Sequence, residues 1–172
     1  LARLNWLADG SGVLLQRQTR DQRILDLIHV DLKTQKSKVI LSEAAGTYIN
    51  LHNDLYPLKD GSGFLWSSET SGYRHIELRA MDGTLIKQIT SGEWAVDGIS
   101  RIDEESQTIF FSGFKDTPLE RHLYSVSYND PQTPQRLTKA GMTHRVNVAP
   151  GLKTFIATSS STSQPPQVGL YD

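Results

Sequence analysis

The sequence of 172 residues has no cysteine and almost no net charge. The absence of cysteine excludes disulfides, zinc–thiolate sites, iron–sulfur clusters and cysteine nucleophiles. The 18 basic and 19 acidic side chains give a net charge of −1, so the chain has no electrostatic footprint for nucleic acid or an anionic membrane. No apolar run reaches the roughly 18 residues that a membrane-spanning helix needs. We therefore predict no nucleic-acid partner and no membrane span.

Amphipathic helices are also missing from the pattern. We find no apolar stripe with a helical period that is long enough for a helix of three turns. Apolar residues instead form short stretches rich in β-branched and aromatic side chains, separated by turn residues about every 8–12 positions. Asp-Gly pairs, such as Asp9-Gly10 and Asp60-Gly61, supply the positive φ that tight hairpin turns need. The pattern predicts an all-β chain with short connections.

The apolar stretches repeat at a nearly constant interval. The strands that follow the turn signals are expected to begin at Val13, Phe64, Ile109 and Phe155, which lie 51, 45 and 46 residues apart. A unit of four strands and about 45–50 residues is typical of a β-propeller blade. We predict an all-β fold, a partial β-propeller of about 3.5–4 four-stranded antiparallel blades. A β-sandwich with the same number of strands is the alternative.

The predicted blades are about 1–42, 53–91, 97–139 and 143–172, and the last is incomplete because it lacks its outermost strand. Single-chain propellers need about four to eight blades to close. Both ends of the sequence interrupt an apolar pattern. We therefore expect residues 1–172 to be a fragment of a β-propeller domain, with more blades on both sides and apolar blade faces exposed.

Short sequences recur at matching positions of the repeat. Arg74-His75-Ile76 corresponds to Arg121-His122-Leu123, and Gln88-Ile89-Thr90 corresponds to Arg136-Leu137-Thr138. A residue that recurs at one position of every blade is more naturally structural than catalytic. We therefore expect both histidines to serve the fold.

Two His-x-acid pairs are the candidates for a metal site. His52-x-Asp54 and His75-x-Glu77 have the spacing that places two side chains on one face of a strand. Two ligands are too few, and the sequence offers no third. We therefore predict no metal site and no cofactor, and we interpret these histidines as solvated or hydrogen-bonded side chains.

Serine chemistry has no support in the sequence. The Gly-x-Ser-x-Gly nucleophile elbow is absent. Ser11 and Ser62 lie in the segments Asp9–Gly12 and Asp60–Gly63, which we interpret as hairpin turns because no base accompanies them. The same segments lack the lysine and the helix of a phosphate loop. We predict no catalytic residue in this chain.

Three other features are interpreted structurally. The arginines of Arg17–Arg23 are expected on a solvated hairpin tip rather than on a nucleic-acid surface. Trp94 is expected to fill a gap between blades. Ser159–Pro166 is expected to be a polar hairpin loop or a mobile segment without chemistry.

Several segments with distinctive residues occur in order between about residues 3 and 126. They are Leu4–Leu7, Gln16–Gln22, Asn50–Asp54, Asp60–Glu69, Gly72–Ile76, Thr90–Val96 and Pro118–Tyr124. In order and spacing they resemble the propeller domain of the dipeptidyl peptidase IV branch of the prolyl oligopeptidase (S9) family, most closely its bacterial members. The rest of the chain continues in the same blade rhythm.

The resemblance implies an eight-bladed propeller joined to an α/β-hydrolase domain that carries a Ser-Asp-His triad. The hydrolase domain is absent from this sequence, and the family's paired-glutamate segment, which captures the substrate's N-terminal amine, would lie before residue 1. No catalytic residue is therefore carried over. The channel-facing part of the family's propeller corresponds to about Tyr48–Asn50, where mammalian relatives offer a Phe-Arg pair. This chain has Ile49-Asn50 there, so we assign no substrate-channel residue.

On this basis we predict a non-catalytic propeller segment of a serine dipeptidyl peptidase that releases N-terminal dipeptides with Pro or Ala at the second position. The segment would gate substrate access and scaffold the hydrolase domain. Its expected partners are the missing blades and the α/β-hydrolase domain of the parent chain, the peptide substrate and, in a homodimer, a second parent chain. The resemblance alone indicates a periplasmic or cell-associated bacterial location.

Two other functions stay open at this point. The first is a stand-alone β-propeller module that binds peptides or proteins. The second is a sugar-handling propeller enzyme, which would need paired carboxylates on the channel, for which Glu93 and Asp97 are the candidates. A Gly-x-Ser-x-Gly motif downstream in the reading frame would favour the peptidase, and further blades followed by a stop codon would favour the binding module.

Overall fold

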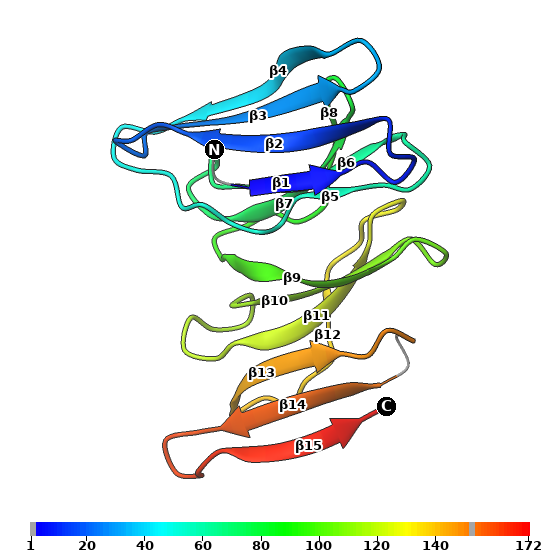
Figure 1. The fold of residues 1–172 in the computed structure, drawn as a ribbon. Coiled ribbons are helices and arrows are strands. Elements are labelled where there is room, and N and C mark those ends of the chain that lie inside the picture. The colour runs from blue at the N-terminus through cyan, green and yellow to red at the C-terminus, as the bar shows by residue number, and fades with distance from the viewer. Residues whose placement is uncertain (1–2, 152–153) are drawn as a thin grey trace. The chain divides into compact units, whose positions relative to one another are not determined.

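The computed structural model describes residues 3–151 and 154–172, and its regular structure there consists of β-strands. They form four meanders in which neighbouring strands of a sheet are consecutive in the sequence (Figure 1). The first two sheets contain β1 (Arg3–Trp6), β2 (Gly12–Gln18), β3 (Ile24–Asp31), β4 (Lys36–Ala44), β5 (Tyr56–Pro57), β6 (Gly63–Ser68), β7 (His75–Ala80) and β8 (Leu85–Gln88). The last two contain β9 (Val96–Asp103), β10 (Thr108–Gly113), β11 (His122–Ser127), β12 (Gln135–Arg136), β13 (Thr143–Val148), β14 (Phe155–Ser160) and β15 (Gln167–Tyr171).

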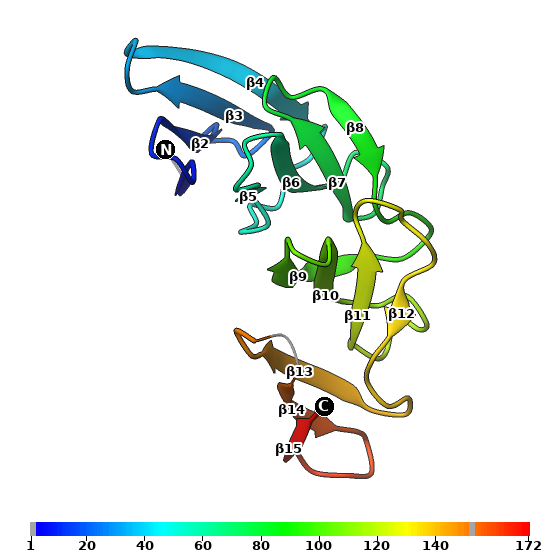
Figure 2. The same ribbon diagram turned by 90° about the vertical axis from the view of Figure 1, so that its right-hand side faces the viewer.

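This topology confirms the predicted fold class, an all-β partial propeller. Three sheets have four strands each, and the last sheet has three strands, β13, β14 and β15. In Figure 2, β8 lies beside β7 and β12 lies beside β11, each at the edge of its sheet. A Greek-key sandwich would instead send consecutive strands to different sheets. The described residues contain no helix that is long and apolar enough to cross a membrane.

The Asp-Gly-Ser-Gly segments form the β1–β2 and β5–β6 turns, as predicted. Gly10 and Gly61 have φ values of 70° and 72°, a region that glycine enters without a steric penalty. The second glycine of each segment has a different role. A side chain at Gly12 or Gly63 would collide with a main-chain carbonyl of the adjacent strand, so only glycine allows this close approach.

The chain divides into two compact units, of which the first comprises residues 1–72 and 76–88. Its core joins the first sheet to the second. Leu14, Leu25 and Leu27 of β2 and β3 pack in one buried cluster with Phe64 and Trp66 of β6. Burial of these apolar faces holds the two sheets face to face.

The second unit comprises residues 73–75 and 89–172, and rings dominate its interior. Trp94 stacks on Phe111 at a centroid distance of 6.1 Å, and Phe111 stacks on Tyr124 at 5.5 Å. The imidazoles of His122 in β11 and His144 in β13 lie 5.3 Å apart between the third and fourth sheets. Trp94 also meets the imidazole of His75 edge-on at 5.0 Å, in agreement with its predicted space-filling role.

A main-chain hydrogen bond recurs where one meander leads into the next. The carbonyl of Arg74, before β7, accepts the N–H of Val96 at 2.9 Å, and the carbonyl of Arg121, before β11, accepts the N–H of His144 at 2.9 Å. Within the first unit, the carbonyl of Gln22 accepts the N–H of Ile49 at 2.8 Å. We call these three contacts the joint bonds.

The recurring sequences are hydrogen-bonding partners. The Nδ1 atoms of His75 and His122 lie 3.1 Å and 2.9 Å from the hydroxyls of Thr90 and Thr138, respectively. Each pair therefore ties the third strand of a sheet to the segment near its last strand. The expectation that both histidines serve the fold agrees with these contacts, since both side chains are buried.

One sequence prediction needs correction. Ser159 and Ser160, which we expected in a polar loop, belong to β14, where they pair with His144 and Thr143. Ser159 is buried, and its hydroxyl donates to Nδ1 of His144 at 2.7 Å. The strand can continue through this polar sequence because the buried Ser159 hydroxyl has a hydrogen-bond partner, His144, at the interface between the two sheets.

Candidate functional site

The segment between β4 and β5 carries the residues that the sequence placed near a substrate channel. It runs beside a pocket of about 330 Å³ in the first unit. The pocket is lined by Glu43, Ala44, Ala45, Thr47, Tyr48, Ile49, Glu69, Thr70 and Gly72. Two carboxyl groups and one aromatic ring therefore share this cavity.

The three residues Tyr48, Ile49 and Asn50 have different surroundings. Ile49 is 7% exposed and belongs to the core cluster, so its side chain is unavailable to a ligand. Tyr48 is 59% exposed and lines the pocket. Asn50 donates its side-chain amide to the two carboxylate oxygens of Glu69, at 3.2 Å and 3.1 Å. The surface available to a ligand is therefore the Tyr48 ring and the Asn50–Glu69 pair.

The second carboxyl of the pocket, Glu43, is buried beneath this surface. Its Oε1 accepts the indole N–H of Trp66 at 2.8 Å. Burial raises the pKa of Glu43, hydrogen bonds from Trp66 and Ser68 oppose that rise, and the charge of nearby Glu77 adds to it. Glu43 thus combines a structural hydrogen bond with a higher tendency to be protonated than an exposed glutamate has.

His52, Asp54 and Ser67 form a buried constellation that contains the residue types of a catalytic triad. The hydroxyl of Ser67 donates to Oδ2 of Asp54 at 2.9 Å, and the Asp54 N–H donates to Nδ1 of His52 at 3.2 Å. A triad needs the opposite arrangement, in which the serine hydroxyl faces the histidine and the aspartate orients it. This constellation is therefore structural.

The two predicted His-x-acid pairs have separate surroundings. The His52 ring meets Trp66 at 4.5 Å. His75 lies 2.9 Å, through Nε2, from the carbonyl of Gly92, whereas Glu77 pairs with Arg79 at 2.7 Å. In the part of the chain that the structure describes, no three His, Asp or Glu side chains are grouped to hold a metal.

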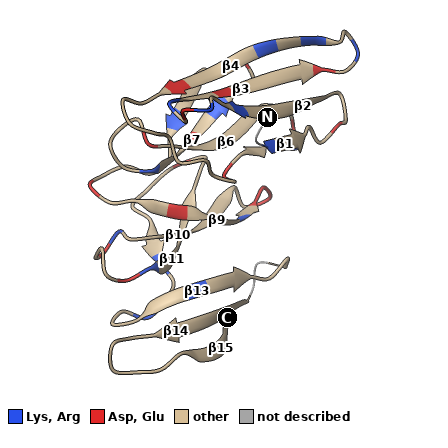
Figure 3. Cartoon of the chain, turned by 60° about the vertical axis from the view of Figure 1, so that its left-hand side comes forward, with Lys and Arg blue, Asp and Glu red and all other residues tan. Residues whose placement is uncertain are grey.

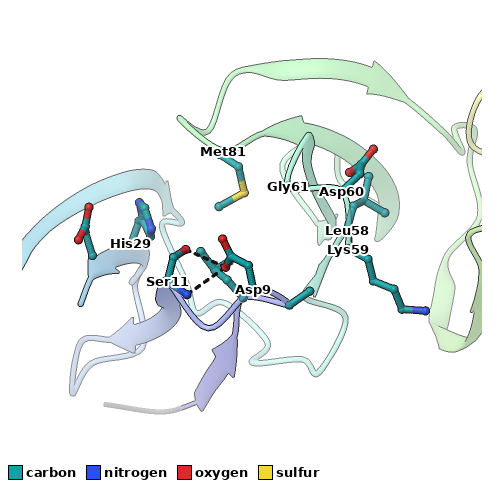
Figure 4. A pocket seen from close by; sticks show the side chains of 11 residues that line it. Asp9, Ser11, His29, Leu58, Lys59, Asp60, Gly61 and Met81 are labelled. Carbon is teal, nitrogen blue, oxygen red and sulfur yellow. Dashed lines mark hydrogen bonds between the residues drawn. The ribbon is translucent and has the colours of Figure 1, made fainter. Parts of the chain in front are cut away.

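The Asp-Gly-Ser-Gly turns border a second pocket of the first unit, of about 310 Å³ (Figure 4). Asp9 accepts hydrogen bonds from the amide and the hydroxyl of Ser11, at 3.0 Å and 2.8 Å, and Asp60 is bonded by Ser62 in the same way. These bonds lower the pKa of both carboxyls. Since each serine hydroxyl donates to a carboxylate of its own turn, neither is activated by a histidine base.

The remaining sequence candidates have ordinary partners. Arg17 forms an ion pair with Asp26 at 2.7 Å, beside the turn that joins β2 to β3. Asp97, a candidate carboxylate for sugar chemistry, is paired with Arg121 at 3.1 Å, and Glu93 is exposed. The ion pair between Asp97 and Arg121 therefore gives no support to a sugar-handling mechanism with paired carboxylates.

The comparison with known proteins decides the family. A profile of the family described as "Dipeptidyl peptidase IV (DPP IV) N-terminal region" matches residues 1–166. The chain belongs to the dipeptidyl peptidase IV N-terminal region family. Its relatives include dipeptidyl peptidase 8 of Homo sapiens (30% identical over 99% of this chain), dipeptidyl peptidase 8 of Mus musculus (32% over 77%) and dipeptidyl peptidase 4 of Arthroderma otae (31% over 72%).

The chain covers 25%, 18% and 17% of these three relatives, respectively, so it corresponds to a small part of a dipeptidyl peptidase IV-type chain. The family assignment confirms the predicted resemblance to the dipeptidyl peptidase IV branch, whereas the likeness to its bacterial members stays a prediction. In this dipeptidyl peptidase IV N-terminal region, the segments that carried the resemblance form strands, turns and the loops that supply joint bonds and buried hydrogen-bonded pairs. Their chemistry is structural, which agrees with a region that is not the catalytic one.

Sequence reasoning missed four residues of the site and its surroundings. Gln18, Glu43 and Ser67 have partners 31, 23 and 13 positions away, respectively, and His144 contacts another sheet. A buried polar residue inside an apolar strand is the signal that could have found Ser67, which follows Phe64-Leu65-Trp66. The other partners become evident only in the folded chain, where a strand meets another sheet or the β4–β5 segment.

Proposed function

We propose that this chain is the non-catalytic propeller segment of a serine dipeptidyl peptidase. In the parent protein it would scaffold an α/β-hydrolase domain and gate the access of peptides to it. The hydrolase would release N-terminal dipeptides with Pro or Ala at the second position, through an acyl-enzyme. The observation that carries the proposal is the family match over residues 1–166 in a chain that covers a quarter or less of its relatives.

The environment of the serines near the two pockets supports a non-catalytic role. Ser11 and Ser62 donate to the carboxylates of their own turns, and Ser67 donates to a buried aspartate. A nucleophilic serine needs a base that accepts its proton, and these carboxylates act as structural acceptors instead. The chemistry of the parent would therefore come from residues outside this chain.

Two apolar sheet faces support the scaffolding role. On the outer face of the first sheet, Leu4, Trp6 and Val39 are exposed, and Trp6 reaches 63%. On the last sheet, Val168 and Leu170 of β15 are 74% and 70% exposed. β14 and β15 contain no charged residue, and their ribbons are tan throughout in Figure 3. Apolar faces of this kind are typical of surfaces that another part of a protein covers.

The pocket at Tyr48 supports the gating role. An exposed aromatic ring beside the Asn50–Glu69 pair offers apolar contact together with hydrogen-bond acceptors. This is the kind of surface that holds an extended peptide. The segment carries no secondary structure, yet hydrogen bonds fix Ile49 and Asn50, the two residues that follow the ring.

The test compares two proteins with Ala-Pro-nitroanilide as the substrate. The longer chain that contains this segment should release nitroaniline, and the 172-residue chain should show no turnover. Replacing the serine of a downstream Gly-x-Ser-x-Gly motif by Ala should abolish the activity of the longer chain. Turnover by the 172-residue chain, or activity that survives the serine replacement, would overturn the proposal.

Gating has its own measurement. The longer chain should remove the Ala-Pro dipeptide from a short unfolded peptide and leave the same N-terminus intact on a folded protein. Equal rates on the two substrates would contradict gating while leaving the peptidase assignment in place. A longer chain without any peptidase activity that instead binds peptides would favour the stand-alone binding module.

A further inference from the structure

Two hydrogen bonds fix the main chain of the segment next to the Tyr48 ring. The N–H of Ile49 donates to the carbonyl of Gln22 at 2.8 Å, and the carbonyl of Ile49 accepts the side-chain amide of Gln18 at 2.7 Å. Both partners come from the β2–β3 hairpin of the first sheet. The peptide groups on either side of the Ile49 Cα are thus held while its side chain enters the core.

The hairpin that supplies these partners is itself ordered. Gln22 has a φ of 62°, a left-handed conformation at the tip of the turn. The N–H of Gln22 donates to the carbonyl of Thr19 at 3.0 Å, and hydrogen bonds from Thr19 and Arg23 lower the pKa of Asp21 in the same turn. A rigid turn presents its donor and acceptor at fixed positions, which lowers the entropy cost of holding the segment.

We propose that Gln18 is a positioning residue for peptide recognition, which holds the Ile49 carbonyl so that Tyr48 lines the pocket and Asn50 reaches Glu69 at the pocket wall. The inference rests on the proposed function, because it assigns peptide contact to that pocket. Ile49 is anchored by Gln18 on one side, and Asn50 is bonded to Glu69 on the other. Tyr48 precedes these anchors, and its 59% exposed ring is available for contact with a peptide.

The role of Gln18 depends on its being a donor. A carbonyl oxygen only accepts hydrogen bonds, so Nε2 of Gln18 must point at Ile49. Gln18→Glu keeps the size of the side chain, removes the donor and directs a carboxylate oxygen at the carbonyl. Gln35→Glu is the matched control, since Gln35 is an exposed residue of the β3–β4 turn and the charge change is the same.

The first measurement is hydrogen exchange in the 172-residue chain. Gln18→Glu should accelerate exchange at Ile49 by about fivefold, since one net hydrogen bond is equivalent to about 1 kcal/mol. The strands β6 and β7 should keep their protection, and Gln35→Glu should change neither region. Unchanged exchange at Ile49, or a loss of protection throughout the unit, would contradict a local positioning role.

The second measurement is steady-state kinetics on the longer chain with a peptide substrate. Gln18→Glu should raise KM by about twofold to tenfold and leave kcat nearly unchanged, since a lost net hydrogen bond of this size reduces binding. Gln35→Glu should behave as the parent. A lowered kcat at constant KM, or no change at all, would overturn the inference.

The two measurements separate this inference from the proposed function. If the longer chain has no peptidase activity, the proposed function fails and the recognition role of Gln18 fails with it. Accelerated exchange at Ile49 would then still identify Gln18 as a structural anchor. If the longer chain is active and Gln18→Glu is kinetically silent, the proposed function stands and the recognition role of Gln18 is wrong.

Discussion

The two compact units join neighbouring sheets with different side chains. In the first unit, leucines of β2 and β3 meet Phe64 and Trp66, and one buried carboxyl, Glu43, accepts the indole N–H. In the second unit, stacked aromatic rings lead to the imidazole pair of His122 and His144. Both units nevertheless use joint bonds between main-chain groups. The comparison teaches that the blade topology depends on the main chain and tolerates different interior chemistry.

Burial shifts the pKa of one titratable group in each interior, in opposite directions. Burial raises the pKa of Glu43 in the first unit. In the second unit, burial lowers the pKa of His144 and the neighbouring His122 adds to this effect, against the Lys139 carbonyl and Glu120. Because a carbonyl only accepts, Nε2 of His144 must carry its proton toward Lys139, and Nδ1 accepts the Ser159 hydroxyl. Each interior therefore favours the neutral form of its buried group.

The largest expected effect tests whether the units unfold separately. Phe64→Ala and Phe111→Ala each remove a fully buried ring, which costs about 3–5 kcal/mol of the free energy of unfolding. Hydrogen exchange should accelerate in β1–β8 for Phe64→Ala and in β9–β15 for Phe111→Ala. If either substitution accelerates exchange equally along the whole chain, the units form one cooperative structure and the comparison fails.

A pH series provides a second test with opposite signs in the two units. The folded pKa of Glu43 lies above 4.5, so this group stabilises the first unit less as the pH rises from 4.5 through that pKa. The folded pKa of His144 lies below 6.5, so its contribution to the second unit is lost as the pH falls from 6.5 through that pKa.

The measurement is the difference between variant and parent in the free energy of unfolding at each pH. Glu43→Gln keeps an acceptor for Trp66. Its free energy of unfolding, relative to that of the parent, should be higher at pH 7 than at pH 4. The free energy of unfolding of His144→Asn, relative to that of the parent, should be higher at pH 5 than at pH 7.5. Differences that do not change with pH would show that neither interior penalises the charged form.

The smallest expected effect concerns a partly exposed ion pair of the second unit. Asp97→Asn removes the partner of Arg121, and pairs of this kind contribute about 0–1 kcal/mol. The guanidinium keeps its hydrogen bond to the carbonyl of His144 at 2.9 Å. Chemical denaturation should therefore give a nearly unchanged midpoint. A loss above about 2 kcal/mol would mean that this ion pair contributes more than partly exposed pairs do.

Local patterns were sufficient to predict the all-β class and the Asp-Gly turns, but not the end of β14 at Ser160. Asp9-Gly10 and Asp60-Gly61 determine their own conformation, since positive φ and an Asp acceptor are properties of adjacent residues. The structural role of His75 and His122 followed from their recurrence at equivalent positions. The interval between repeats was also sufficient to predict the number of sheets.

Contacts between residues distant in the sequence could not be predicted from local patterns. The Gln18–Ile49 and Glu43–Trp66 bonds join residues 31 and 23 positions apart, and no local pattern specifies such pairs. Ile49 illustrates the difficulty, because its side chain packs in the core while the preceding Tyr48 is exposed and lines the pocket. The orientation of each residue in an irregular segment depends on tertiary packing, which periodicity does not describe.

The joint bonds have a consequence for how such a chain can change over time. Each bond links a carbonyl and an N–H, at Gln22 and Ile49, at Arg74 and Val96, and at Arg121 and His144, so it depends on position and not on the side chain. Substitutions can therefore accumulate at these places without breaking the link, whereas an insertion or deletion would displace it. Selection should preserve the length of a blade more strictly than its residues, which accounts for a repeat that is regular in spacing and weak in identity.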